Sequence, residues 1–396
     1  MKDSELNRRA FIKRSIAGAS GALLATPALA RLGVQERATA KESGETIRRP
    51  LGNTGITLPI VSMGVMRADN PGLVRAALQA GFVHLDTAHG YQKGKNEQML
   101  GEVLKDYPRE SFVIATKIAP DDRESFLAKL DTSLERLKMK YVDILYLHGL
   151  SSKDDVLSAD QLEALKAAKK SGKARFVGVS THKNEPEVIL AAIESGVYNV
   201  VLTSVNFKQD HYSEVKKAIA KAAEAGIGIV AMKTMAGGFF DKEKTKPVNC
   251  KAALKWVLQD ENVTTAIPGI TTFDMLAENA GVNQDLTMTD KEKGDLALGT
   301  SESGLYCQGC QRCVPGCSKR LPIPDIMRSY MYAYGYGNAS MAQTLLAELK
   351  LPSGVCSDCT ECSVRCVKGF NVPEKITDIT RLTTVPGEFL SGGLTA

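Results

Sequence analysis

Short apolar runs rich in β-branched residues alternate with longer amphipathic stretches along most of this chain. Eight runs have the character of strands, and the stretches between them carry Ala, Leu, Lys and Glu in the pattern of surface helices. The runs are 59–65, 83–87, 112–118, 142–148, 175–180, 200–206, 228–233 and 265–268. This alternation indicates parallel βαβ units, and eight of them predict an α/β fold that closes into a (β/α)8 TIM barrel.

The stretch 121–137 illustrates the helical pattern between these strands. Its apolar residues recur every three or four positions, which predicts one face buried on the sheet. They are Phe126, Leu127, Leu130, Leu134 and Leu137. Four glycines stand just before strands, where a helix end commonly needs left-handed backbone. These glycines are Gly81, Gly172, Gly196 and Gly226.

The length and composition predict two domains. With 396 residues the chain exceeds the roughly 250 residues that a typical barrel takes. Its 43% hydrophobic and 24% charged residues are those of an ordinary globular protein. We expect a signal peptide over 1–30, a linker over 31–45, the barrel over 46–290 and a small, mostly helical domain over 300–385.

The charge is concentrated at the beginning of the chain. Residues 1–30 hold five basic and two acidic residues and so contribute +3 of the net +5. The remainder is close to neutral and shows no basic stripe. Binding to a nucleic-acid backbone needs a concentrated cationic face, so no nucleic-acid partner is predicted.

The first thirty residues have the features of an export signal. Arg8 and Arg9 precede Phe11 and Lys13, a weakly hydrophobic run follows, and small residues end it at Ala30. This arrangement resembles a twin-arginine signal, which implies the twin-arginine export machinery as a partner and a periplasmic location. The alternative is a basic amphipathic N-terminus that stays on the protein. No run in the chain is long and apolar enough to predict a transmembrane span.

Polar residues at the strand ends are the candidates for chemistry, because a barrel of this kind carries its active site there. Asp86, Lys117 and His148 end three consecutive predicted strands, and Tyr91 follows the first of them. Segment 81–91 with the following Asn-Glu pair resembles the signature of the aldo-keto reductase family. The strand ends at Lys117 and His148 match two further segments of that family. The resemblance implies an oxidoreductase that interconverts a carbonyl and an alcohol by hydride transfer.

The chemistry of these four side chains agrees with that resemblance. Hydride addition to a carbonyl leaves an alkoxide that needs a proton, and the phenol of Tyr91 can donate one. A free phenol has a pKa of about 10, so we expect Lys117 to lower it while Asp86 holds the ammonium in place. His148 would polarise the carbonyl oxygen. Each residue alone is more often an ion-pair or capping residue, but the four together favour a catalytic tetrad.

The resemblance also implies a nicotinamide cofactor, NAD(P)(H). By comparison with the family, the cofactor-binding residues are Ser180, Asn206, Gly269, Glu278 and Asn279. Gly269 and Met275 stand where the family has cations for a 2′-phosphate, which favours NADH over NADPH. Three positions around the nicotinamide ring also depart from the family pattern: Thr181, Leu202 and Met232.

Eight of the nine cysteines form two identical runs with the spacing C-x2-C-x2-C-x3-C. The first run is Cys307, Cys310, Cys313 and Cys317, and the second is Cys356, Cys359, Cys362 and Cys366. The spacing predicts two 4Fe-4S clusters, with zinc or disulfides as the less favoured readings. The pattern resembles bacterial two-cluster ferredoxins, which implies that Cys366 binds with the first three cysteines and Cys317 with the second three. Cys250 is expected to be a buried apolar residue rather than a ligand.

Two functions agree with these features. The first is an exported aldo-keto reductase that acts on a small carbonyl or alcohol, with clusters that exchange electrons with a redox partner protein. Family members with a ferredoxin-type tail form a recognised subgroup, which the whole chain resembles. The alternative is an electron-transfer or binding protein whose barrel no longer turns over nicotinamide. Binding of nicotinamide distinguishes the two, because a carrier need show none.

Overall fold

The computed structural model describes residues 45–240, 245–301, 305–351, 355–356, 359 and 362–390. The predicted signal peptide and nearly all of the predicted linker lie outside the described residues. From Thr46 onward the chain forms one compact unit. Among the described residues, no helix combines the length and the apolar character needed to cross a membrane.

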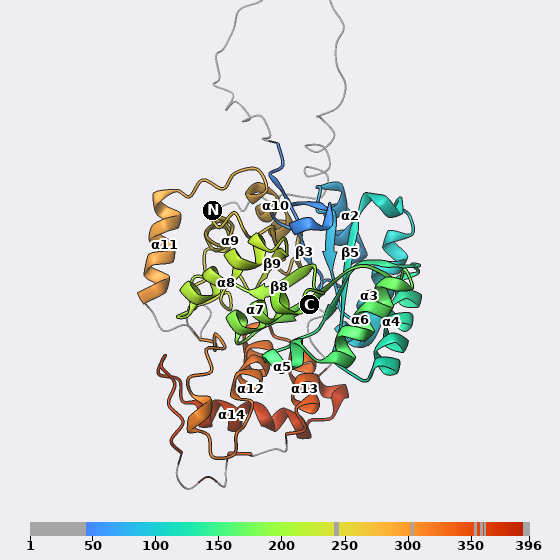
Figure 1. Ribbon diagram of the computed structural model, residues 1–396. Coiled ribbons are helices and arrows are strands. Elements are labelled where there is room, and N and C mark those ends of the chain that lie inside the picture. Colours follow the sequence, from blue (N-terminus) through green and yellow to red (C-terminus); the bar gives the residue numbers. More distant parts are fainter. Residues whose placement is uncertain are drawn as a thin grey trace, which may run out of the picture. The chain divides into compact units, whose positions relative to one another are not determined.

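Eight parallel strands form a curled sheet, as predicted (Figure 1). They are β3 (Met63–Gly64), β4 (His84–Asp86), β5 (Val113–Ile118), β6 (Val142–Leu147), β7 (Ala174–Thr181), β8 (Val200–Ser204), β9 (Gly228–Met232) and β10 (Thr265–Ala266). Neighbours in the sheet follow chain order from β3 to β10. Parallel bridges from Val61 to Ala266 and from Gly64 to Gly269 join its two edges. The predicted (β/α)8 barrel is therefore confirmed.

An antiparallel hairpin closes the end of the barrel where the strands begin. It consists of β1 (Arg48–Pro50) and β2 (Thr57–Pro59), and it inserts Leu51 and Leu58 among the buried interior residues of the barrel. A Cβ atom on Gly228 would stand 2.5 Å from the side chain of Leu51, so the close packing there requires glycine. Side chains fill the barrel at the end where the strands begin, so a pocket can form only at the opposite end, where the strands end.

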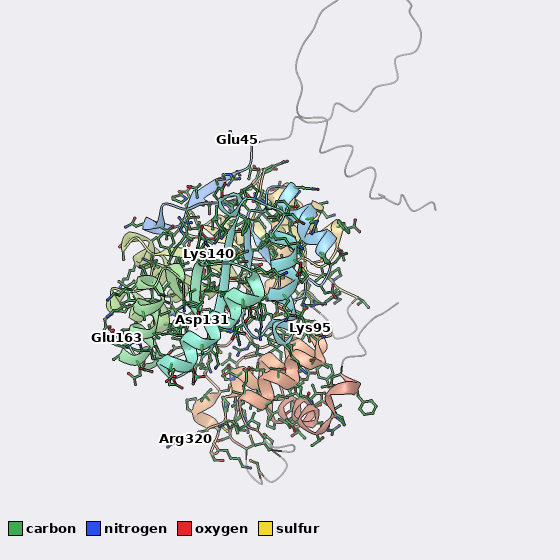
Figure 2. The ribbon with its side chains drawn as sticks, turned by 90° about the vertical axis from the view of Figure 1, so that its right-hand side faces the viewer. Glu45, Lys95, Asp131, Lys140, Glu163 and Arg320 are labelled. Atoms are coloured by element: carbon green, nitrogen blue, oxygen red, sulfur yellow. The ribbon has the colours of Figure 1, made fainter. Side chains whose placement is uncertain are left out.

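Helices follow the strands around the outside of the barrel. They are α2 (Pro71–Gln79), α3 (Lys95–Leu104), α4 (Arg123–Leu137), α5 (Lys153–Val156), α6 (Ala159–Lys170), α7 (Glu185–Ser195), α8 (Tyr212–Glu224), α9 (Cys250–Leu258) and α10 (Phe273–Val282). In α4, Phe126 and Leu130 are buried as predicted, whereas Leu127 is only half-buried. Charged residues such as Asp131 on α4 and Glu163 on α6 lie exposed on the outer side (Figure 2). The four glycines predicted to be left-handed all have positive φ.

A further helix extends the barrel beyond its predicted end at residue 290. This is α11 (Asp290–Ser301), which is joined to α9 by an ion pair of 3.1 Å between Lys255 and Glu292. Lys255 also donates a hydrogen bond of 2.6 Å to the carbonyl of Thr287. The C-terminal region therefore begins after residue 301.

The C-terminal region is mostly helical, as predicted, and packs around its own apolar cluster. Its helices are α12 (Ile323–Tyr330), the π-helical turn η5 (Met331–Gly335), α13 (Ala339–Glu348) and α14 (Val372–Thr380), coloured orange to red in Figure 1. Met331, Leu345 and Leu346 are buried, in agreement with the sequence pattern. Tyr334 is 45% exposed, and its ring centre lies 4.5 Å from that of Tyr330, which packs against the cluster.

Polar contacts attach the C-terminal region to the barrel. Asp210, in the loop after β8, accepts from Arg312 at 2.9 Å and from Lys368 at 2.6 Å. Lys183, after β7, forms an ion pair with Asp325 on α12. Because Arg312 and Lys368 lie beside different cysteine runs, one carboxylate holds both runs against the barrel.

His84 is expected to make the fold acid-sensitive. It lies fully buried on β4 with no hydrogen-bond partner for either ring nitrogen, and burial lowers its pKa to about 4. Below about pH 6.5 the histidine of the unfolded chain binds a proton, whereas that of the folded protein does not. The free energy of unfolding therefore decreases as the pH is lowered. By about pH 5, His84→Leu should lose roughly 2 kcal/mol less unfolding free energy than the wild type. Urea unfolding at about pH 7.5 and pH 5 measures this, and equal losses in both proteins would contradict it.

Candidate active site

A buried ion pair stands at the ends of β4 and β5. The ammonium of Lys117 donates to the carboxylate of Asp86 and, at 2.6 Å, to the carbonyl of Thr87. Both side chains are almost fully buried, and burial raises the pKa of Asp86 and lowers that of Lys117 against their mutual attraction. The parallel pairing of β4 with β5 brings the two strand ends together. The Lys117 ammonium is thus fixed in place.

The loop that carries Tyr91 is held by a buried network of side chains. Asn96 donates to the carbonyls of Val65 at 2.8 Å and Ala68 at 3.0 Å, and it accepts from Thr87 at 2.6 Å. Glu97 accepts from Thr116 at 2.7 Å and pairs with Arg136 at 3.3 Å; Arg136 in turn donates to the carbonyl of His89 at 3.0 Å. The Asn-Glu pair of the predicted signature therefore positions the loop.

Tyr91 lies beside this ion pair, but its acidity differs from the expectation. The Lys117 ammonium is 5.1 Å from the centre of the Tyr91 ring. Burial, together with the nearby Asp86 carboxylate, raises the pKa of Tyr91 well above 10. The expected lowering by Lys117 was wrong for this structure, because that ammonium is already neutralised by Asp86. Tyr91 therefore stays protonated.

His148 completes the four predicted catalytic residues. Its ring lies edge-on to that of Tyr91 with the centres 6.2 Å apart. Burial lowers the pKa of His148 to about 3, and the cations Lys117, Arg328 and Lys233 add to the effect. The imidazole is therefore neutral at ordinary pH and can donate one hydrogen bond to a carbonyl oxygen.

These side chains line a pocket with a volume of about 850 Å³, large enough for a cofactor and a small substrate. One wall is the strand ends of the barrel, including Met232, Gly269 and Met275. The other is the C-terminal region, with Arg328, Tyr332 and residues of α13. The pocket is thus built from both parts of the chain.

The predicted cofactor-binding residues do not all reach this pocket. Gly269 lines it with open space above its Cα, whereas Ser180 is fully buried and accepts a hydrogen bond from the Gly149 amide at 2.9 Å. Glu278 is exposed on α10, and Asn279 on the same helix is buried. Asn206 donates at 3.0 Å to Gln308 of the C-terminal region. Among the five, the described lining of the large pocket includes Gly269 alone.

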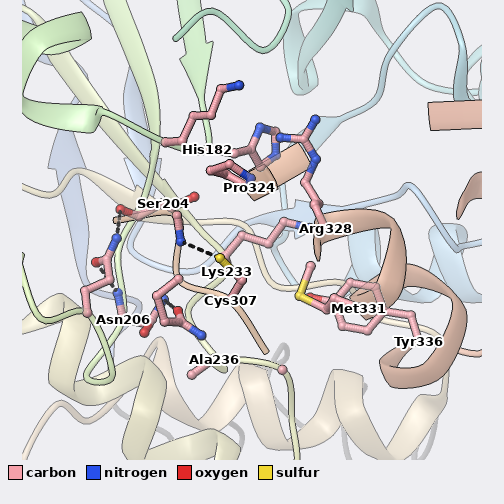
Figure 3. Close-up of a pocket in the computed structure, with 15 residues that line it drawn as sticks. His182, Ser204, Asn206, Lys233, Ala236, Cys307, Pro324, Arg328, Met331 and Tyr336 are labelled. Carbon is pink, nitrogen blue, oxygen red and sulfur yellow. Dashed lines mark hydrogen bonds between the residues drawn. The ribbon is translucent and has the colours of Figure 1, made fainter. Parts of the chain in front are cut away.

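Four pocket residues were not predicted from the sequence: His182, Lys233, Arg328 and Tyr332. His182, Lys233 and Arg328 also surround a smaller cavity of about 40 Å³ next to Cys307 (Figure 3). Lys233 directly follows β9. Asp86 and Lys117 were identified because they are polar residues at strand ends, and the same criterion could have identified Lys233. Nothing in the sequence indicates that the C-terminal residues face the barrel.

The thiols gather in two groups within the C-terminal region. The pKa of Cys307 is raised to about 12, mainly by burial and in part by three nearby thiols: Cys310, Cys313 and Cys366. Burial also raises the pKa of Cys356, again with a contribution from three thiols: Cys359, Cys317 and Cys362. All nine cysteines are free of disulfides, and Cys250 is half-buried at the edge of the large pocket.

Comparison with known proteins agrees with this geometry. Residues 64–252 match the model of the aldo/keto reductase family. L-galactose dehydrogenase of Arabidopsis thaliana is 25% identical over 294 residues, covering 63% of this chain and 92% of that protein. An aldo-keto reductase of Mycolicibacterium smegmatis is 28% identical over 256 residues, covering 59% and 90%.

Over residues 64–252 the barrel is therefore similar to the aldo/keto reductase family. A solved structure of an aldo-keto reductase from Bacillus halodurans has the same fold, with a TM-score of 0.54 at 20% identity, covering 64% of this chain and 96% of that one. These similarities support an oxidoreductase that acts on carbonyl and alcohol groups, and members of the aldo/keto reductase family commonly use NADP(H). The family-model match ends at residue 252, so the cysteine runs lie outside it.

Proposed function

We propose that this aldo/keto reductase is exported to the periplasm, interconverts a carbonyl and an alcohol by hydride transfer, and carries two 4Fe-4S clusters for electron transfer. The observation that carries the catalytic part is the convergence of Asp86, Tyr91, Lys117 and His148 in one pocket at the strand ends. Such a convergence of titratable groups is typical of active sites.

In this proposal each residue has one task at the reacting oxygen. Neutral His148 donates a hydrogen bond that polarises the carbonyl, and Tyr91 gives the proton that the developing alkoxide needs. Asp86 fixes Lys117, whose ammonium lies 5.1 Å from the centre of the Tyr91 ring. A bound dihydronicotinamide supplies the hydride.

The pocket has room for a nicotinamide dinucleotide. It extends from the catalytic residues along β10 to Gly269, Thr271 and Met275, where the resemblance places the adenine end of the cofactor. A Cβ on Gly269 would meet no atom within 4 Å, so the backbone is open to a ligand there. Among the described residues that line this segment there is no arginine or lysine for a 2′-phosphate, which supports a preference for NADH.

The proximity of the cysteines to one another supports the proposal of two cubane clusters. The thiols group as Cys307, Cys310 and Cys313 with Cys366, and as Cys356, Cys359 and Cys362 with Cys317, the crossed arrangement of two-cluster ferredoxins. Ser363 of the second run donates to the carbonyl of Gly316 beside the first at 2.7 Å. Among the described residues no set of three His, Cys, Asp or Glu side chains converges on one metal ion. A cubane does not require that, because each of its cysteines binds a different iron.

One observation favours the second candidate, an electron-transfer or binding protein without nicotinamide turnover. Leu202 is buried in the barrel interior, and the Thr181 hydroxyl donates at 2.7 Å to the carbonyl of Lys183. Neither side chain is free to hold a nicotinamide amide. A fluorescence titration with reduced nicotinamide dinucleotide decides between the two, because saturable binding supports the reductase and its absence supports the carrier.

Tyr91→Phe should nearly abolish carbonyl reduction. Loss of a general acid lowers kcat by about 10²- to 10⁴-fold, while the fold and the binding of nicotinamide should be unchanged. Tyr107→Phe, outside the pocket, is the matched control and should keep full activity. The measurement is steady-state oxidation of reduced nicotinamide with simple aldehydes. Equal kcat values for both variants would remove Tyr91 from the reaction.

Cys366→Ser should disrupt one cluster and leave the other. The crossed arrangement assigns Cys366 to the cluster of the first run, so the iron content should fall by about half if the altered cluster is lost. Cys250→Ser is the control, since this cysteine lies outside both groups. Iron analysis and electron paramagnetic resonance of anaerobically purified protein provide the measurement. Iron-free wild-type protein that remains folded would contradict the proposal.

Replacing Arg8 and Arg9 together by lysine should block export. The twin-arginine machinery reads the arginine pair itself, so a change that keeps the charge should still retain the protein in the cytoplasm. Lys13→Arg serves as the control and should be exported. Cell fractionation measures the location, and sequencing of the mature N-terminus should begin after Ala30. Export of the double variant would show that another signal is read.

A further inference from the structure

Tyr332 reaches the catalytic pocket from outside the barrel. It lies in η5, is 5% exposed and lines the same pocket as Tyr91 and Lys117. It is close enough to Tyr91 to contribute electrostatically to the raised pKa of that residue. Short π-helical turns are rare and occur frequently at functional sites. The turn places a second phenol opposite the tetrad.

Lys233 lies against this second phenol. Its ammonium is 4.7 Å from the ring centre of Tyr332 and 5.2 Å from that of Tyr336, and it is hydrogen-bonded to Tyr332. The backbone of Lys233 has a φ of 59°, which strains any residue except glycine. Strain of this kind persists only where the surrounding structure holds it, and it is concentrated at active sites.

The pocket contains two pairs of a phenol and an ammonium, Tyr91 with Lys117 and Tyr332 with Lys233. They differ in whether a carboxylate also binds the ammonium. Lys117 is neutralised by Asp86, whereas no ion pair joins Lys233 to a carboxylate in the described part of the chain. Arg328, one helical turn before Tyr332, adds a second cation; it is held by Asp325 at 3.0 Å, and its Nε is buried without a partner. Tyr332 therefore faces Lys233, Arg328 and the Asp325 carboxylate, and Lys117 and Tyr91 are also close enough to interact with it electrostatically.

The acidity of the two phenols follows from these surroundings. Burial raises the pKa of Tyr332, but Lys233 and Arg328 outweigh both burial and the Asp325 carboxylate, so its pKa is lowered below the usual 10. The pKa of Tyr91 is shifted in the opposite direction, well above 10. The second phenol thus has the environment that the sequence had predicted for the first.

We propose that Tyr332 is a second proton-donating phenol of the catalytic pocket, activated by Lys233, and that the C-terminal region is thereby a part of the active site. This inference rests on the proposed function for its reaction. Hydride from a dihydronicotinamide forms the new C–H bond, and the electron pair of the C=O π bond moves to oxygen. The oxygen takes its proton from the Tyr91 hydroxyl, and the Tyr332 hydroxyl in turn gives its proton to Tyr91. The phenolate that remains is stabilised by the Lys233 ammonium until water returns the proton.

Tyrosinate absorbance tests the activated phenol without any turnover. In rapid pH jumps of the purified holoprotein, one tyrosine should ionise before all the others. Tyr332→Phe should remove this early step, Lys233→Met should move it to higher pH, and Lys233→Arg should retain it. Tyr334→Phe is the matched control, because Tyr334 is exposed outside the pocket and should leave the early step unchanged. Absence of an early step, its survival in Tyr332→Phe, or its indifference to Lys233→Met would each overturn the pair.

The pH dependence of aldehyde reduction tests the donor role. Tyr332→Phe should lower kcat by about tenfold or more, with a smaller change in KM, because a donor acts in the transition state. Lys233→Met should move the alkaline limb of the kcat profile to higher pH. An unchanged kcat in Tyr332→Phe would overturn the donor role even if the titration shows the early step. If the wild type reduces no carbonyl, the proposed function fails and the donor role with it, while the titration still decides whether the activated phenol exists.

Discussion

The buried ion pair of Asp86 and Lys117 is the constraint around which the pocket is arranged. Taking both charges out of water costs several kcal/mol per ion, which their mutual attraction and the hydrogen bond from the ammonium to the Thr87 carbonyl offset. The pair joins the ends of β4 and β5 and fixes the floor beneath Tyr91. Because Asp86 neutralises Lys117, the first phenol is left without a free cation, and its pKa rises rather than falls. Lys233, which has no ion pair with a carboxylate in the described part of the chain, lies instead against the second phenol.

The barrel and the convergence of its candidate catalytic residues could be predicted from the sequence because parallel strands bring their carboxyl ends to one edge. Residues at the ends of successive strands, such as Asp86, Lys117 and His148, therefore lie close together, and this does not depend on the rest of the chain. The position of the C-terminal region follows from different contacts. Single pairs such as Lys183 with Asp325 dock it on the barrel, and no periodicity in the sequence indicates them. Tyr332 was therefore not predicted.

The cofactor contacts show the limit of comparison with a family. Glu278 keeps the residue type of its family position but is exposed on α10, and Asn206 is engaged by Gln308 of the C-terminal region. That region lies beyond the match to the family model, so a family pattern contains no information about its effect on the barrel. Here the first cysteine run lies directly against the strand ends: a Cβ on Gly309 would stand 2.8 Å from the His182 carbonyl. Catalytic pocket and cysteine runs are consequently neighbours.

Hydride transfer in this pocket is the central step of the proposed function. The direct measurement is a single-turnover reaction, mixing purified holoprotein anaerobically with an aldehyde and nicotinamide dinucleotide that carries deuterium at the transferring carbon. If the proposed function is correct, deuterium should appear on the carbinol carbon of the alcohol product. Bound nicotinamide that passes no deuterium to any carbonyl compound, in protein that retains its fold, would contradict it.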